Sequence, residues 1–141
     1  MIKKIITGLL IFNSLYSASE RHTTLKKKSD EIKTDTLFNA IKASSAFSVV
    51  QALHAGANVN GSKDGVSPLK RAAILHWVAS ELQENTKKIG YQKMFSCLLN
   101  AGADPLQKDP SDKESVIDFV QKYKARGLID ELEHFGYLKK S

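Results

Sequence analysis

Few side chains in this sequence have the types and spacings that metal binding or catalysis requires. Metal sites need histidine, cysteine or acidic residues at short, regular intervals. None of the four histidines has a second potential metal ligand at such a spacing. They are His22, His54, His76 and His134. Cys97 is the only cysteine, and it stands among apolar residues in a helical pattern. That context is typical of a small buried side chain.

Other catalytic arrangements are missing as well. Asp130, Glu131 and Glu133 are close in sequence, but a solvated helix face accounts for them. The glycines are isolated or occur in turns, so no phosphate-binding loop is predicted. We therefore expect no catalytic residues, no cofactor and no metal, and we predict that the protein is not an enzyme.

The elements of this chain are predicted to be helices, and two of them end alike. Residues 52–58 (ALHAGAN) and 98–104 (LLNAGAD) each combine the end of an apolar helix with a glycine stop and a turn-forming Asn or Asp. A helix ending that recurs in this way indicates a repeat array. Arrays of stacked helices generally offer a surface to a partner and no pocket for chemistry.

A helix start lies between these two endings. Asp64 and Gly65 predict a tight turn. Ser67 follows as the predicted N-cap, and Pro68 takes the first helical position, where its missing N–H costs nothing. The next residues are small and apolar, which predicts a narrow face that neighbouring helices can approach closely.

These segments together resemble ankyrin repeats. Residues 64–73 (DGVSPLKRAA) are similar to the D-G-x-T-P-L-H-x-A-A start of that family, with Lys70 replacing the histidine, and residues 98–104 match its L-L-x-x-G-A-D ending. The resemblance is to a small, bacterial, secreted member. It implies an all-α fold, a short solenoid of about three helix-turn-helix units over residues 35–138, with the outer two as caps.

The central unit carries an insertion. Gly56 and Gly102 are 46 residues apart, whereas an ankyrin unit has about 33 residues. The surplus falls over residues 74–91, where helical spacing predicts that the first helix runs on by about two turns. Polar residues 84–88 predict a longer connection, with the second helix beginning near Tyr91. A binding surface and a mere extension of the core are both consistent with this insertion.

The resemblance implies that a partner binds the concave face, at the turns and the first helices. The matching positions are Lys63, Asp64, Val66, Ile74, Leu75, Ser111, Asp112, Glu114, Lys122 and Tyr123, with Asp35, Ala43 and Ser44 in the first unit. Solvated turns or ordinary packing would explain each of them equally simply. Trp77, within the insertion, is either a core residue, which we favour, or an exposed interface anchor.

The N-terminus has the three parts of a secretory signal peptide. A positive start, a short apolar run and small residues make up residues 1–19, and we predict cleavage after Ser19, with Ser17 and Ala18 as close alternatives. The apolar run is shorter than the roughly 20 residues of a membrane span; an uncleaved anchor or a buried helix are the alternatives. Residues 20–34 are predicted to be a polar linker or a frayed helix, and residues 139–141 a solvated tail.

These features predict a secreted or periplasmic protein, without a membrane span after cleavage and monomeric. Its predicted function is non-catalytic binding of an unknown protein partner. The alternatives are a structural or inhibitory subunit of the cell envelope, and a basic surface that binds an anionic polymer or membrane. The net charge of +6 is small and scattered, and Lys3 and Lys4 contribute two of it, so no nucleic-acid partner is expected.

Overall fold

The computed structural model describes residues 23–140, and the chain divides into two units, residues 1–32 and 33–141. The predicted signal peptide lies outside the described residues. Residues 23–42 are helical; those at 23–32 belong to the first unit and are all exposed, whereas 33–42 belong to the second. The stretch expected to be a linker or a frayed helix is thus helical from residue 23.

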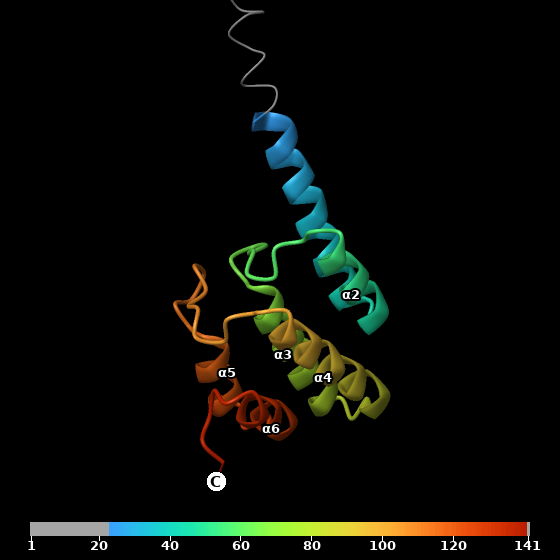
Figure 1. The fold of residues 1–141 in the computed structure, drawn as a ribbon. Helices are drawn as coiled ribbons and strands as arrows, with labels where there is room; N and C mark the ends of the chain where they lie inside the picture. Colours follow the sequence, from blue (N-terminus) through green and yellow to red (C-terminus); the bar gives the residue numbers. More distant parts are fainter. Residues whose placement is uncertain (1–22, 141) are drawn as a thin grey trace, which may run out of the picture. The chain divides into compact units, whose positions relative to one another are not determined.

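The second unit is built from helices, and the predicted all-α class is confirmed (Figure 1). After the helix of residues 33–42 come α2 (Ala46–His54), α3 (Pro68–Glu81), α4 (Asn85–Asn100), α5 (Val116–Lys122) and α6 (Arg126–His134). No strand occurs within residues 23–140. The only pairings of strand type there are two isolated bridges, Lys63 with Val66 and Lys108 with Ser115.

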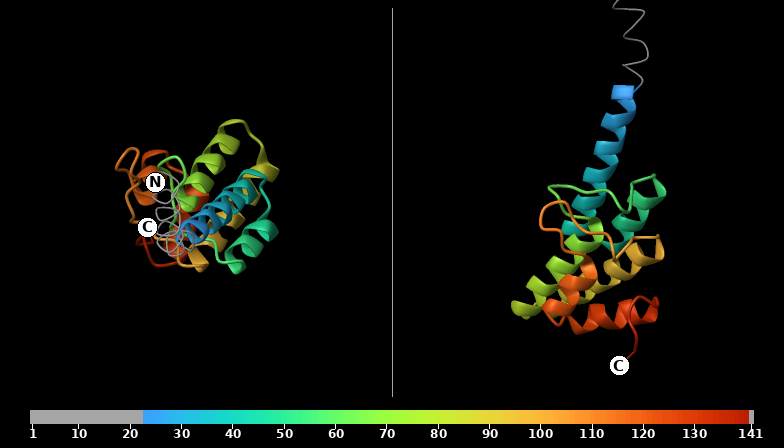
Figure 2. Two further views of the ribbon diagram at one scale, coloured as in Figure 1. Left: turned by 90° about the horizontal axis from the view of Figure 1, so that it is seen from above. Right: turned by 90° about the vertical axis from the view of Figure 1, so that its left-hand side faces the viewer.

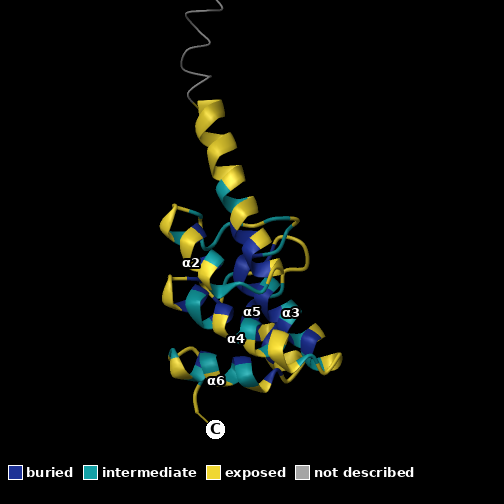
Figure 3. Cartoon of the chain, turned by 90° about the vertical axis from the view of Figure 1, so that its right-hand side faces the viewer, coloured by how far each residue is buried: buried dark blue, intermediate teal, exposed yellow. Residues whose placement is uncertain are grey.

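The helices form three consecutive antiparallel pairs stacked in two layers (Figures 1 and 2). The first members of the pairs are residues 33–42, α3 and α5, and the second members are α2, α4 and α6. Helix α4 contacts α3 within its own pair and both α2 and α6 in its layer, while α3 contacts α5. The core runs between the layers, and Figure 3 shows the buried residues gathered there.

The first helix of every pair ends with the same backbone geometry. Ser44, Gln83 and Lys124 follow these helices with φ of 57°, 57° and 51°, a left-handed conformation that non-glycine residues adopt at a cost. The next residue in each case donates its N–H to the carbonyl five positions earlier, at 2.8–3.2 Å. Each connection is therefore closed by backbone hydrogen bonds in one repeating form.

The second helices also end alike. Gly56, Gly102 and Gly136 follow them with φ of 98°, 96° and 82°, which only glycine adopts freely. Asn58 and Asp104 then each accept a hydrogen bond, at 2.9 Å, from the N–H two residues further on. The recurring sequence GA(N/D) thus corresponds to a recurring structure.

The predicted start of α3 is confirmed in detail. The Ser67 hydroxyl accepts from the N–H of Lys70 at 3.2 Å, and Pro68 opens the helix. Ser115 caps α5 in the equivalent way, and the Asp118 carboxylate accepts a hydrogen bond from the Ser115 N–H, which completes a capping box. Both helix starts follow directly from local sequence.

The insertion lengthens both helices of the central pair. Helix α3 has 14 residues against 7 in α5, and α4 has 16 against 9 in α6. Seven residues are about two turns, so the buried face keeps its direction while the hairpin grows by roughly 10 Å. The expected long connection and late second helix were wrong: α4 begins at Asn85, and only residues 82–84 connect the two helices.

Candidate functional site

A tight turn projects from the loop before α3. Lys63 and Val66 exchange two backbone hydrogen bonds of 3.0 and 3.1 Å, and Asp64 and Gly65 between them have φ of 54° and 75°. The Gly65 carbonyl accepts a 2.9 Å hydrogen bond from the Ser111 hydroxyl in the equivalent loop of the next pair. A Cβ added at Gly65 would approach Ser111 Cβ to 2.8 Å. The two loops are therefore packed against each other at Gly65, where a larger residue would force Ser111 to move.

A groove with a volume of about 320 Å³ opens between this turn, the first helix and α3. Its lining residues are Phe38, Asn39, Lys42, Lys63, Asp64, Arg71 and Leu75. Phe38 is only 5% exposed and contributes an apolar base. The groove therefore combines an apolar floor with charged walls, on the face formed by the first helices of the pairs.

The walls of the groove carry more positive than negative charge. Lys63 forms a 2.8 Å ion pair with Asp35, and both side chains are partly exposed. Among residues 23–140, neither Lys42 nor Arg71 has an ion-pair partner. Asp64 is the one acidic side chain in the lining. Two cations thus face solvent beside an apolar floor.

An apolar stripe continues from the groove along α3. Leu75 is half-buried, and Val78 and Leu82 follow it at intervals of three and four residues, which places them on one helix face. Val78 is 38% exposed and Leu82 is 64% exposed. Val78 lies in the last turn of α3 and Leu82 is the residue that caps its end, so the insertion extends the apolar part of this surface.

Lys70 joins α3 to the loop before α5. Its side chain is 2% exposed, and its ammonium lies 2.6 Å from Asp112, 3.4 Å from Asp109 and 3.4 Å from Glu114. Burial by itself lowers the pKa of Lys70, but the hydrogen bond to Asp112 and the charges of Asp109 and Asp112 outweigh it and raise the pKa. The hydrogen bond from Lys70 in turn lowers the pKa of Asp112. This cluster connects the second helix pair to the third through Lys70.

Trp77 packs against the next pair. Its ring lies 4.6 Å from that of Tyr123, at the end of α5, and Tyr123 lies 4.7 Å from Phe119. Trp77 is partly buried and contacts the core. Lys122 places its ammonium 5.2 Å from the Tyr123 ring. The aromatic residues therefore link α3 to α5, and Trp77 combines core packing with partial exposure.

His76, on the buried side of the extended part of α3, is 1% exposed. Within the described part of the chain neither ring nitrogen has a hydrogen-bond partner. Burial, with a smaller contribution from the nearby positive charge of Lys88, lowers the pKa of His76 to about 4. The histidine is therefore neutral at physiological pH and acts as a packing residue.

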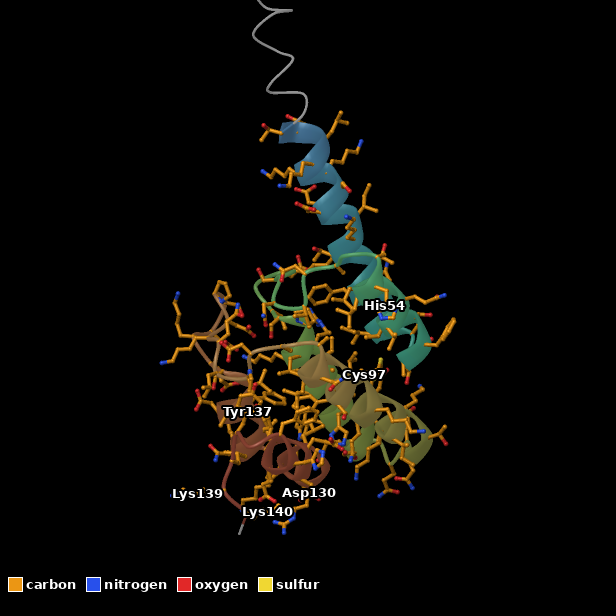
Figure 4. All side chains as sticks on the ribbon, viewed as in Figure 1. His54, Cys97, Asp130, Tyr137, Lys139 and Lys140 are labelled. Carbon is orange, nitrogen blue, oxygen red and sulfur yellow. The ribbon has the colours of Figure 1, made fainter. Side chains whose placement is uncertain are left out.

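The opposite face of the second unit carries Cys97 and His54 (Figure 4). Cys97 is half-buried on α4, and His54 is exposed at the end of α2. No group of three or more His, Cys, Asp or Glu residues within residues 23–140 is placed to hold a metal ion. No helix in this range is long and apolar enough to cross a bilayer.

The structure brings only part of the predicted surface together. Lys63, Asp64 and Leu75 line the groove, and Val66 closes the turn beside it. Ile74 is half-buried against the core. The other predicted residues serve contacts between the second and third pairs: Trp77, Ser111, Asp112, Glu114 and Tyr123. Lys122 instead lies near Glu114 and Tyr123 of its own pair. In the first pair, Asp35 forms the ion pair with Lys63, Ala43 is exposed, and Ser44 is in the connection to α2.

Four groove residues were not singled out from the sequence: Phe38, Asn39, Lys42 and Arg71. Arg71 stands one turn before Leu75, a spacing that could have identified it. No family model, curated protein or solved structure matches the chain. Function is therefore inferred from the groove and from the resemblance noted above.

Proposed function

We propose that this chain is an exported, non-catalytic protein-interaction module of the ankyrin-repeat type. Its partner is a protein that binds the groove between the first helix, the turn at Lys63–Val66 and α3. Ser19 marks the proposed end of the leader, so the working protein is secreted or periplasmic. We propose no catalytic activity for this chain.

The regularity of the three pairs supports the ankyrin part of the proposal. The first helices share one connection geometry at residues 44, 83 and 124, and the second helices share a glycine ending. The projecting turns lie at the junctions between pairs, where Ser111 bonds to Gly65. Units that repeat their backbone and pack only on their neighbours are the defining property of solenoids.

The groove is the observation that carries the binding role. It offers an apolar base at Phe38, cations at Lys42 and Arg71 that have no ion pair with any residue in the described range 23–140, and an exposed apolar stripe beyond Leu75. Exposed apolar residues flanked by charged ones characterise protein-binding surfaces. Two of the polar side chains on α3 are not available to a ligand: Lys70 is paired with carboxylates and His76 is buried.

Site-specific photo-crosslinking tests this function. A photoreactive amino acid replaces Leu75 in the groove, and in a matched control it replaces Lys93, which is exposed on α4. Cells of the source organism are irradiated and the adducts are identified by mass spectrometry. The proposal requires one stoichiometric protein adduct at position 75 and none at position 93. Adducts of equal yield at both positions, or at neither, contradict it.

The export part is tested by the N-terminal sequence of the protein recovered outside the cytoplasm. Cleavage after Ser19 leaves Glu20 as the first residue. Recovery of protein that still carries Met1 contradicts a cleaved leader. It does not affect the proposal that the groove binds a protein, which the crosslinking experiment tests separately.

A further inference from the structure

The charges of the groove identify the kind of protein segment that fits it. Lys42 and Arg71 carry no ion pair among the described residues, and Lys63 shares its charge with Asp35. Asp64 is the one acidic residue in the lining, so the groove has an excess of positive charge. Unpaired cations facing an open groove attract an anionic ligand and steer its approach.

The apolar surface narrows the class further. Phe38 and Leu75 lie within the groove, and Val78 and Leu82 continue the same face of α3 outward. A phosphate polymer would satisfy the cations and leave this apolar stripe in water. A peptide with acidic residues at one end and apolar residues at the other satisfies both halves of the surface.

We infer that the occupant of the groove is an acidic, amphipathic protein segment: its Asp or Glu side chains pair with Lys42 and Arg71, and its apolar side chains cover Leu75, Val78 and Leu82. This inference rests on the proposed protein-binding function and adds the chemistry of the partner. The two extra turns of α3 supply the apolar half. The insertion is thereby assigned a role in specificity.

Selection from a random library of displayed 15-residue peptides, followed by fluorescence anisotropy with synthetic copies, tests the inference on the full chain. We expect enrichment of peptides that combine Asp or Glu with Leu, Ile or Phe. Replacing their acidic residues with Asn and Gln weakens binding at least tenfold. Lys42→Glu and Arg71→Glu each weaken it at least tenfold, whereas Lys93→Glu, with the same charge change on α4, leaves the affinity within twofold.

Two variants guard against loss of folding. Lys42 is exposed, so Lys42→Glu leaves the packing intact even if the half-buried Arg71 does not tolerate Glu. Val78→Asp, on the exposed stripe, removes the apolar half separately. Circular dichroism and thermal melting confirm that each variant is folded before its affinity is measured.

The possible failures are distinguishable. Enriched peptides that are neutral or basic, with binding lost in Val78→Asp, overturn the acidic class and leave the protein-binding function standing. If the enriched peptides bind every groove variant as tightly as the wild type, both the acidic-segment inference and the proposed binding function of the groove are overturned. Tighter binding of heparin or inorganic polyphosphate than of any peptide, abolished by Arg71→Glu, overturns the acidic-segment inference in favour of an anionic polymer.

Discussion

The ammonium of Lys70 lies 2.6 Å from the carboxylate of Asp112, with Asp109 and Glu114 around the same nitrogen. Lys70 belongs to α3, and its carboxylate partners belong to the loop before α5. This contact fastens the last helix pair to the central one at a point where both Lys70 and Asp109 are withdrawn from water. Its removal is therefore expected to affect stability more than an exposed ion pair does.

Lys70→Met is predicted to lower the free energy of unfolding by about 3–5 kcal/mol, because it leaves the buried Asp109 carboxylate without its counter-charge. Urea denaturation measures the change. Lys63→Met is the matched control: it breaks the exposed pair with Asp35 and is expected to cost less than about 1 kcal/mol. Equal effects of the two substitutions would contradict the structural role assigned to Lys70.

The same cluster predicts a pH dependence at both extremes. The pKa of Asp112 is lowered from 3.8 by the hydrogen bond from Lys70, so its contribution to stability is present above pH 3.8 and is lost as the pH falls further. The pKa of Lys70 is raised from 10.5, so its contribution persists below that pH and disappears in strong alkali. Urea midpoints measured below pH 3.8 and above pH 10.5 should converge for the wild type and Lys70→Met.

His76 predicts a separate loss of stability in mild acid. Its pKa is about 4 in the folded chain and near 6.5 when unfolded. Between these values the unfolded chain binds the extra proton, so stability falls with decreasing pH by up to about 1.4 kcal/mol per pH unit. Denaturation at pH 7, 6, 5 and 4 measures the slope. His76→Leu should flatten it, whereas His54→Gln, on the exposed end of α2, should leave it unchanged.

The left-handed connections predict that glycine is stabilising where the sequence has none. Gln83→Gly and Lys124→Gly relieve positive φ angles of 57° and 51°. Each is expected to raise the free energy of unfolding by up to about 1 kcal/mol, because the backbone strain that glycine removes from the folded state outweighs the entropy that it adds to the unfolded chain. Lys93→Gly, inside α4, should instead lower it by about 1 kcal/mol. A destabilising Gln83→Gly would contradict the proposed strain.

Local signals account for the parts of the fold that the sequence predicted. Ser67 and Pro68 define a helix start through the first turn alone, and Gly102 ends α4 through its own φ. The connection at residues 82–84 was missed because Gln83 adopts a left-handed conformation without being glycine. Residues 84–88 are polar because they form the solvent-facing start of α4. Polarity alone could not distinguish such a helix start from a loop.

Half of the groove depends on contacts that no local pattern encodes. In the sequence, Lys42 and Arg71 have no feature that distinguishes them from other helix residues. They line one groove only because the first helix and α3 pack side by side. Lys70 was noticed as a departure from the family motif, yet its burial depends on a loop some 40 residues later. The sequence predicted where the turns are; packing decides which side chains remain available to a partner.

Trp77 offers a spectroscopic test of the junction between α3 and α5. It is the only tryptophan, and its ring lies 4.6 Å from that of Tyr123, so its fluorescence is sensitive to that contact. Tyr123→Ala is predicted to red-shift the emission and to increase quenching by acrylamide, because it removes the ring that covers the indole. Tyr137→Ala, which removes a tyrosine outside this contact, should leave the emission unchanged.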